Sequence, residues 1–242
     1  MNRFTHTIHK PQERSGPSDI TVAILSAGIG ARIKSYEPRS LIKVGNRSLI
    51  EHQISVVSNC LHMPELIGVF GCYASKICKK LRGKLRIIEN QIYDHTNTSE
   101  SLRLAFNSTL NTNFLFFHGD LYFNQDTLKR LDYSKSFIII DKKKQMLDKE
   151  VGVTICNKKA TILSYGLPTK WCQIAYITGK EYKILKNIFN KFDVMNKKLL
   201  SFEILNMMIN MGAVFHCYEP KNMSILEIDC MKDLHYENFN TK

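Results

Sequence analysis

An apolar run that ends in glycines constrains this chain more than any other stretch. The segment VAILSAGIGAR, residues 22–32, begins with four consecutive apolar residues and passes through Gly28 and Gly30 to Arg32. A short apolar run of this kind is typical of a strand buried on both faces, as in a parallel sheet. Glycine permits a tight turn and lets a ligand approach the backbone closely. The stretch therefore predicts a buried strand whose carboxyl end opens onto a binding site.

Apolar runs alternate with helical periods over the first 140 residues. The expected strands are 21–26, 66–70, 85–88, 113–118 and 136–140. Helices are expected between them, among them 49–61 and 99–110, and Asn97 with Glu100 has the spacing of a capping box at the start of the second. The alternation predicts an α/β, Rossmann-like fold with a mostly parallel sheet and helices on both faces.

The pattern changes after residue 150. Short strands at 151–156 and 172–177 are expected to surround a loop, SYGLPTKW, and helices at 180–192 and 199–211 to follow. Two short strands, 213–218 and 224–228, then precede a last helix. With no internal repeat and no linker, we expect one domain over residues 20–242, behind a flexible tail at residues 1–19 that has no apolar core for a secretory signal.

Composition limits the classes of protein that fit. The formal net charge of +12 suits an anionic ligand or simply a lysine-rich surface, and no nucleic-acid-binding motif accompanies it, which makes nucleic acid an improbable partner. No apolar run approaches the ~18 residues of a membrane span. Seven scattered cysteines without a CxxC pair predict reduced thiols and a cytoplasmic protein.

The glycine turn fits neither of two well-known nucleotide-binding motifs. A dinucleotide fingerprint needs a third glycine where Ile33 stands, and no GK[ST] occurs to form a P-loop. What remains is a turn whose free N–H groups can bind phosphate oxygens. Arg32 follows it directly, and Arg39 can bring a second cation to the same ligand. A tight turn with two surface arginines is the alternative interpretation.

Several motifs together resemble one family. LSAGIGARI…EPRSLIKVGNRSLIEHQI is similar to the opening of the sugar-phosphate and choline-phosphate nucleotidyltransferases, the MobA-like NTP transferases. IGVFGCYASKICKKL resembles that family's second strand and helix, and IIENQIYDHTNTSESLRLAF resembles its base-pocket segment. FLFFHGDLYF and NMSILEIDCMKDL resemble the two segments that supply metal-binding aspartates. The cytidylyltransferase branch is the most similar, and the resemblance implies a GT-A-like nucleotidyltransferase fold.

The resemblance also implies a set of site residues. It assigns nucleotide binding to the glycine turn and to the base-pocket segment, at Ser26, Ala27, Gly28, Ile29, Gly30, Asn97 and Ser101. It assigns Mg²⁺ to Asp120 and Asp229, and contacts with the reacting phosphates to Arg32 and Arg39. Lys170, in GLPTKW, is expected to reach the acceptor phosphate. The family's lysine after proline is Arg39 here, and Asp120 lacks the second aspartate of the family's D-x-D.

Four of the candidate site residues have plain structural alternatives. Trp171, the single tryptophan, is expected in a polar loop, where its ring can cover an ammonium group or anchor the loop in the core. Lys170 in the same loop either reaches the acceptor phosphate or is exposed. For Asp120 and Asp229 the alternatives are a turn residue and a helix cap.

The expected activity is Mg²⁺-dependent transfer of a nucleotidyl group from an NTP, with CTP favoured, to a small phosphorylated alcohol, amine or sugar. A sugar-1-phosphate uridylyl- or thymidylyltransferase is the rival within the same class. A glycosyltransferase, an inactive nucleotide-binding relative and a basic nucleic-acid-binding module are the rivals outside it. The protein is expected to be a monomer or a homodimer that does not insert into membranes.

Overall fold

The computed structural model describes residues 16–28, 38–143 and 146–228. Its strands are β1 Ile20–Ser26, β2 Lys43–Val44, β3 Arg47–Ser48, β4 Glu65–Phe70, β5 Arg86–Glu89, β6 Asn113–His118, β7 Leu121–Phe123, β8 Phe137–Asp141, β9 Val151–Cys156, β10 Lys159–Tyr165, β11 Thr169–Ile177, β12 His216–Tyr218 and β13 Ile225–Glu227. Its helices are η1 Arg39–Leu41, α1 Leu49–Cys60, α2 Ala74–Leu81, α3 Thr98–Phe106, η2 Gln125–Thr127, α4 Gly179–Asn190, η3 Asn196–Lys198 and α5 Ser201–Asn210.

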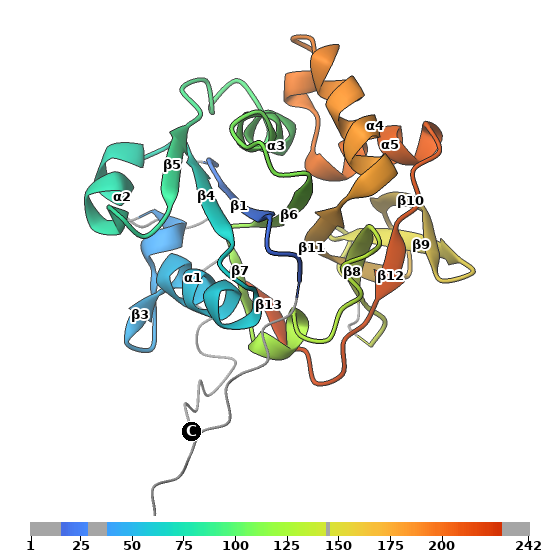
Figure 1. Cartoon of the computed structure of the whole chain (residues 1–242), viewed down its shortest axis with the longest axis horizontal. Coiled ribbons are helices and arrows are strands. Elements are labelled where there is room, and N and C mark those ends of the chain that lie inside the picture. The colour runs from blue at the N-terminus through green and yellow to red at the C-terminus, as the bar shows by residue number, and fades with distance from the viewer. Residues whose placement is uncertain (1–15, 29–37, 144–145, 229–242) are drawn as a thin grey trace, which may run out of the picture.

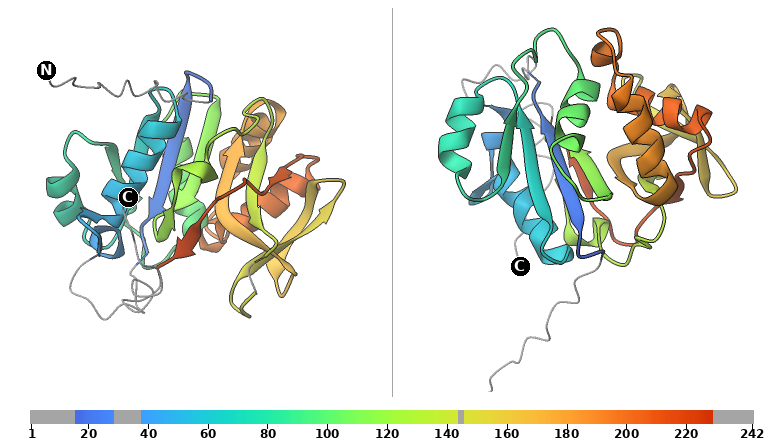
Figure 2. Two further views of the ribbon diagram at one scale, coloured as in Figure 1. Left: turned by 90° about the horizontal axis from the view of Figure 1, so that it is seen from below. Right: turned by 45° about the horizontal axis from the view of Figure 1, so that its top comes forward.

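A nine-stranded sheet runs through the molecule in the order β5-β4-β1-β6-β11-β8-β12-β10-β9 (Figure 1). Its first four strands are parallel, with β1 hydrogen-bonded to β4 on one side and to β6 on the other. From β11 onward the pairing is mixed, because β11 is antiparallel to β6 and to β8. In both views of Figure 2, α2 and the β9–β10 hairpin lie at opposite ends of the molecule. The predicted α/β sheet is confirmed, with its parallel part confined to the first half and the β8–β12 pair.

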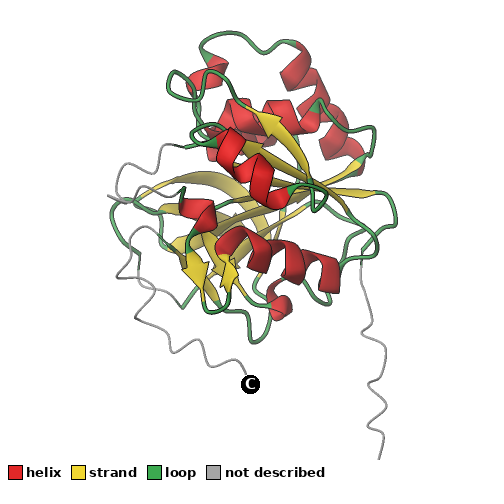
Figure 3. Cartoon of the chain, turned by 90° about the vertical axis from the view of Figure 1, so that its left-hand side faces the viewer, coloured by secondary structure: helices red, strands yellow, loops and turns green. Residues whose placement is uncertain are grey.

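Strand β1 is buried on both faces, as its apolar run predicts. Val22 and Ile24 pack into the core under α1 and α2, whereas Ala23 and Leu25 pack into the core shared with α3, α4 and α5. This division follows from the two-residue period of a strand. Helices therefore cover both faces of the sheet, which Figure 3 shows from the side.

The expected loop at 164–171 is wrong, because most of it lies in two strands. An additional strand, β10, pairs antiparallel with β9 through a two-residue turn, where Asn157 and Lys158 have φ of 50° and 62°. Positive φ at both positions matches the twist of a tight hairpin. Strand β11 begins at Thr169, three residues earlier than expected, because it also pairs with β9. Lys170 and Trp171 are therefore strand residues.

Helix α3 is shorter than the expected 99–110. It ends at Phe106, where the N–H of Ser108 donates to the carbonyl of Ala105, three residues back, and the Ser108 hydroxyl donates to the carbonyl of Leu104. The regular four-residue bonds therefore stop before Leu110, which is 98% exposed. The last expected helix lies outside the described residues.

Strands β7 and β13 form a short two-stranded ribbon outside the main sheet. Strand β13 pairs antiparallel with β7, and the two lie together in Figure 1. Helix α1 holds this ribbon: the amide of Gln53 donates to the carbonyl of Leu121 at 2.7 Å, and the ring of His52 stacks on Tyr122. The ribbon thus lies directly after β6, at the edge where the parallel strands end.

Within the described ranges, no helix combines the length and the apolar character that a membrane crossing needs.

Candidate active site

A pocket of about 460 Å³ opens at the carboxyl ends of the parallel strands. This is where ligands bind in open α/β sheets. The residues that line it come from the ends of β1, β5 and β6, from the start of α3, from η1 and from β13. They are Leu25, Ser26, Ala27, Gly28, Arg39, Asn90, Tyr93, Thr96, Asn97, Thr98, Ser101, His118, Asp120 and Glu227. Of the predicted site residues, Ser26, Ala27, Gly28, Arg39, Asn97, Ser101 and Asp120 are brought together here. Ile29, Gly30, Arg32 and Asp229 lie outside the described residues.

Two glycines let neighbouring strands approach the turn after β1. A Cβ at Gly119 would lie 2.5 Å from the Cβ of Ser26, and one at Gly71 would lie 2.6 Å from the carbonyl oxygen of Ala27. Neither position can therefore carry a side chain unless its neighbours move. The N–H of Gly119 also donates to the carbonyl of Leu25 at 2.8 Å. The ends of β1, β4 and β6 are thus held together around the turn.

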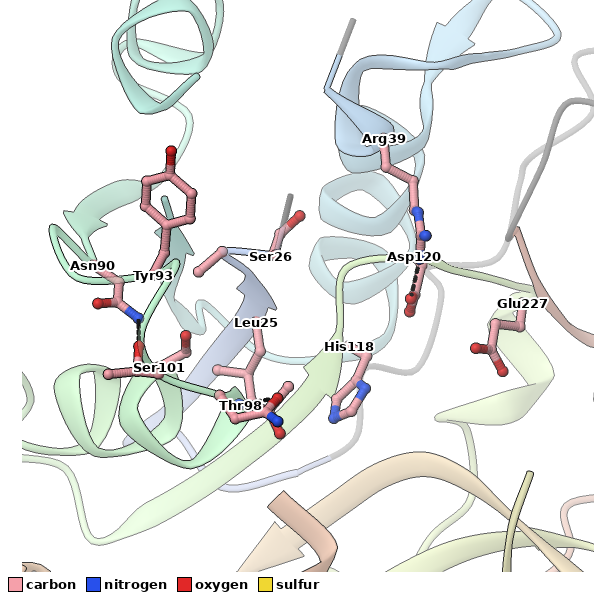
Figure 4. A pocket seen from close by; sticks show the side chains of 14 residues that line it. Leu25, Ser26, Arg39, Asn90, Tyr93, Thr98, Ser101, His118, Asp120 and Glu227 are labelled. Carbon is pink, nitrogen blue, oxygen red and sulfur yellow. Dashed lines mark hydrogen bonds and ion pairs between the residues drawn. The ribbon is translucent and has the colours of Figure 1, made fainter. Parts of the chain in front are cut away.

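The loop between β5 and α3 forms one wall of the pocket. Asn90 is 1% exposed and holds the loop through its side chain, which donates to Thr96 Oγ1 and accepts from the N–H of Ile92. Figure 4 shows Asn90, Tyr93 and Ser101 on this side of the pocket. The wall is therefore fixed by hydrogen bonds within the loop itself.

The start of α3 differs in one respect from the predicted capping box. Asn97 is the N-cap, and its Oδ1 accepts from the N–H of Thr98 at 2.9 Å. Glu100 instead forms a two-bond ion pair with Arg103, one turn further along the helix. The pairing with arginine removes Glu100 from the cap, so only half of the predicted box is present.

Asp120 and Arg39 form an ion pair on the opposite side of the pocket. Arg39 Nη1 lies 2.7 Å from Asp120 Oδ2, and each side chain is 19% exposed, as drawn in Figure 4. The other carboxylate oxygen, Oδ1, is buried and has no hydrogen-bond partner among the described residues. The N–H of Ile228 donates to the backbone carbonyl of Asp120, which places the segment just before Asp229 against this residue. A buried carboxylate oxygen of this kind is costly unless something binds it.

His118 and Glu227 are connected through a glutamine behind the pocket. Gln173 donates from Nε2 to Glu227 Oε2 at 2.7 Å and also hydrogen-bonds to the ring of His118. The Nε2 of His118 lies 2.8 Å from the hydroxyl of Ser201. Burial lowers the pKa of His118 below its usual value, against the opposing effects of Asp120 and Gln173. A neutral ring then accepts from Ser201 and donates from its other nitrogen to the amide oxygen of Gln173.

Lys170 does not line the pocket, contrary to the prediction. It is 4% exposed in β11, ion-paired with Glu150, and its Nζ lies 3.9 Å from Glu227 Oε2. A buried ammonium group needs such carboxylate partners. Its ammonium group therefore lies behind Glu227 in this structure, and a contact with the acceptor phosphate stays a prediction.

Trp171 is a core residue, so its predicted place in a polar loop is wrong. The side chain is 1% exposed, its indole N–H donates to the carbonyl of Ile174, and its ring packs edge-on against His118. No ring face is left for an ammonium group. The apolar alternative, a core anchor, is the arrangement that the structure has.

Several pocket residues were not among the predicted ones. Asn90 follows β5, and His118 ends β6, so both occupy positions that the rule about carboxyl ends of strands singles out. Glu227 lies two residues before Asp229, within the segment that resembles the family's metal-binding motif. Gln173 has no sequence signal, because its position depends on the pairing of β11.

No group of three or more His, Cys, Asp or Glu side chains forms a metal cluster in the part of the chain that the structure describes. Mg²⁺ does not need one, because it commonly binds one or two carboxylates together with substrate phosphates. The buried Oδ1 of Asp120 is an oxygen donor of the required kind. The donor set therefore fits a magnesium site that a bound nucleotide completes.

Comparison with known proteins agrees with this geometry. Residues 22–133 match the MobA-like NTP transferase domain family. No curated protein matches the chain in sequence. The solved CTP:phosphocholine cytidylyltransferase from Streptococcus pneumoniae is similar in structure, with a TM-score of 0.74, 19% identity and coverage of 90% of this chain and 96% of that chain.

Two further solved structures are also similar. The inositol-1-phosphate CTP transferase from T. maritima has a TM-score of 0.72 at 15% identity, covering 90% of this chain and 92% of that one. A UDP-glucose pyrophosphorylase complexed with UDP-glucose has a TM-score of 0.66 at 11% identity, covering 89% and 96%. At these identities the structures show a shared fold.

Residues 22–133 thus match the MobA-like NTP transferase domain, and the protein is an enzyme of the nucleotidyltransferase type.

Proposed function

We propose that this enzyme joins the nucleotidyl group of an NTP, preferably CTP, to a small phosphorylated alcohol, amine or sugar, with Mg²⁺ as cofactor. The observation that carries the proposal is one pocket with a glycine-containing turn on β1 and, facing it, a carboxylate oxygen of Asp120 without a partner among the described residues. The N–H groups of such a turn can bind the oxygens of a triphosphate, and a free carboxylate oxygen can bind the magnesium ion that accompanies the triphosphate.

The reaction forms one bond and breaks one. A phosphate oxygen of the acceptor attacks the α-phosphorus of the NTP, and the bond from that phosphorus to the bridging oxygen breaks to release pyrophosphate. The attacking oxygen is already anionic near neutral pH, so no general base is required. The difficulty is to bring two anions together, and positioning and charge neutralisation lower that barrier.

The chain's own residues divide this work. The turn Ser26–Gly28 offers backbone N–H groups to the triphosphate, and Arg39 holds Asp120 in place through their ion pair. Asp120 would bind magnesium through Oδ1, with Asp229 as the proposed second ligand. A magnesium ion bound there supplies positive charge to the phosphate oxygens in the transition state. Arg32 is proposed to add a bidentate phosphate contact.

The N-cap of α3 supports a preference for CTP. Since Oδ1 of Asn97 accepts from Thr98, the amide end that remains offers only N–H donors. Cytosine presents N3 and O2 as acceptors, whereas uracil carries a proton on N3. A site that offers donors to this edge rejects a base that leaves two donors facing each other.

The test is a panel of four NTPs against phosphorylated acceptors, including phosphocholine, phosphoethanolamine, glycerol phosphate and glucose 1-phosphate, scored by pyrophosphate release. We expect release that depends on Mg²⁺ and on one acceptor, and that is fastest with CTP. Release with UTP or dTTP and a sugar phosphate would favour the sugar-nucleotide alternative. If no combination releases pyrophosphate, the proposed function is wrong.

Paired variants test the metal site. Asp120→Asn should lower kcat by orders of magnitude without unfolding the protein, because it removes a charge from the proposed magnesium ligand. Asp126→Asn, in η2 and outside the pocket, is the matched control and should leave kcat unchanged. Full turnover by Asp120→Asn would remove this residue from the metal site.

A further inference from the structure

The segment 196–201, which leads into α5, forms the back of the wall that α3 presents to the pocket. The N–H of Asn97 donates to the carbonyl of Lys197 at 2.8 Å. The N–H of Ser201 donates to Oγ1 of Thr98 at 2.7 Å, although these two residues are 103 positions apart in the chain. The wall at which the base is proposed to bind is therefore held in place by the C-terminal half of the chain.

Ser201 is buried, with 1% of its surface exposed, and its hydroxyl has a partner outside its own helix. The N-cap of α5 is Leu200, whose N–H donates to the carboxylate of Glu203 at 2.7 Å, so the cap does not use Ser201. The hydroxyl of Ser201 instead lies 2.8 Å from Nε2 of His118. A buried hydroxyl is costly unless it is hydrogen-bonded, so this bond accounts for a polar side chain at position 201.

Ser201 thus contacts two residues that line different walls of the pocket. Thr98 is the first residue of α3, whereas His118 ends β6, two positions before Asp120. In the view of Figure 4 the ring of His118 lies between Thr98 and Asp120. The N–H and the hydroxyl of one buried residue therefore connect the wall of α3 to the strand end that carries the proposed magnesium ligand.

We propose that Ser201 is a positioning residue that places the nucleotide-binding wall of α3 correctly relative to Asp120. This inference rests on the proposed function, since it concerns the same pocket. Nucleotidyl transfer requires the α-phosphorus of the bound NTP to lie beside Asp120, and a misplacement of about 1 Å lowers a rate by about 10²-fold. The two bonds of Ser201 act on different steps. Its N–H holds the wall that binds the NTP, whereas its hydroxyl holds His118 beside the reacting groups.

Three substitutions at position 201 separate these contacts. Ser201→Ala removes the hydroxyl and keeps the N–H, so kcat for pyrophosphate release should fall by about tenfold while the KM for CTP stays within about twofold. Ser201→Pro also removes the N–H, and the KM for CTP should then rise by about fivefold in addition. Proline is tolerated at the first position of a helix, and Leu200 before it already has the extended conformation that proline requires, with φ of −82° and ψ of 158°. Ser201→Thr keeps both groups and should recover most of kcat.

Ser136→Ala is the matched control. Ser136 is 2% exposed, its hydroxyl accepts from the N–H of Thr178 at 2.9 Å, and it is not among the residues that line the pocket. This variant should lower the melting temperature about as much as Ser201→Ala does and leave kcat and both KM values unchanged. If Ser201→Ala changes the melting temperature alone, as the control does, Ser201 has a structural role and the inference is wrong.

Calorimetric titration with CTP and Mg²⁺, without an acceptor, measures binding apart from turnover. The Kd for CTP should rise about fivefold for Ser201→Pro and stay unchanged for Ser201→Ala, and equal values for both variants and the wild type would overturn the inference. Thr98→Val removes the acceptor of the same N–H bond and should raise this Kd by a similar factor, which keeps the test decisive if Ser201→Pro does not fold. Absence of pyrophosphate release by the wild type with every NTP and acceptor would overturn the proposed function, while the Kd values would still decide the role of Ser201.

Discussion

The contact between the ends of β1 and β6 predicts that Gly119→Ala will damage both stability and activity. A methyl group at position 119 would lie 2.5 Å from Ser26 Cβ and 2.6 Å from Ser26 Oγ. Carbon atoms in protein interiors pack at about 3.5–4.0 Å, so the two strand ends would have to separate by about 1 Å. Gly119 is not among the residues with positive φ, which means that the cost comes from this contact and not from backbone strain.

The size of the effect follows from what the contact holds in place. Overpacking of this kind costs about 1–3 kcal/mol of unfolding free energy. The displacement also stretches the 2.8 Å bond from Gly119 N–H to the carbonyl of Leu25 and moves Asp120 relative to the turn of β1. A shift of about 1 Å between catalytic groups lowers kcat/KM by roughly 10²-fold.

A double-variant cycle measures both effects. Urea unfolding and pyrophosphate release would be recorded for Gly119→Ala, for Ser26→Gly and for the two changes combined. Without the side chain of Ser26, the atom of that residue nearest to the new methyl group is its Cα, at 3.2 Å. The double variant should therefore regain most of the stability that Gly119→Ala loses. Simple addition of the two single costs would refute the reasoning, because it would show that the residues do not compete for the same space.

Three further outcomes are expected. Arg39→Ala should lower kcat/KM by at least tenfold more than Arg39→Lys, measured by pyrophosphate release, because the lysine keeps a cation beside Asp120; equal losses would contradict this. Hydrogen bonds from Lys84 and Ser48 lower the pKa of the Glu51 carboxyl from 4.5 to about 2. The contribution of Glu51 to the unfolding free energy, about 1 kcal/mol after solvent screening, is therefore present above pH 4.5 and is lost as the pH falls toward 2. Urea unfolding of Glu51→Gln against the wild type, from pH 7 down to pH 2, should show a difference that shrinks over this range, and a constant difference would exclude the ion pair as its cause. Trp171→Phe should lower the unfolding free energy by about 1–2 kcal/mol through the lost indole hydrogen bond and buried area, and an unchanged midpoint in urea would mean that this anchor is dispensable.

The parts of the fold that could be predicted are those with strong local signals. The apolar runs of β1, β4, β6 and β8 mark buried strands, and the rule that sites form at the carboxyl ends of such strands correctly brings Ser26, Asn97 and Asp120 to one pocket. Strand β10 was missed because its residues alternate irregularly between exposed and buried positions. The hydrogen bonds of its pairing with β9 stabilise this strand, although its own sequence has no clear strand pattern.

The misplaced residues share a different cause. Lys170 reads as a surface residue in the sequence, because the two carboxylates that make its burial tolerable, Glu150 and Glu227, are 20 and 57 positions away. Gln173 adopts a left-handed conformation, with φ of 58°, where the register of β11 against β8 shifts between Trp171 and Ala175. Tertiary contacts decide both, and no local pattern reports them.

The ribbon formed by β7 and β13 has a consequence for how the molecule opens. It joins segments that are 100 residues apart, as the bond from Ser224 to Asn124 shows, and it is held by a short ladder outside the main sheet. Strand β1, by contrast, is bonded along its whole length on both sides. Amide hydrogens of β13 should therefore exchange with solvent through local opening, while those of β1 exchange only when the whole domain unfolds. The side of the pocket that Glu227 of β13 lines should therefore open and close while the rest of the fold stays intact.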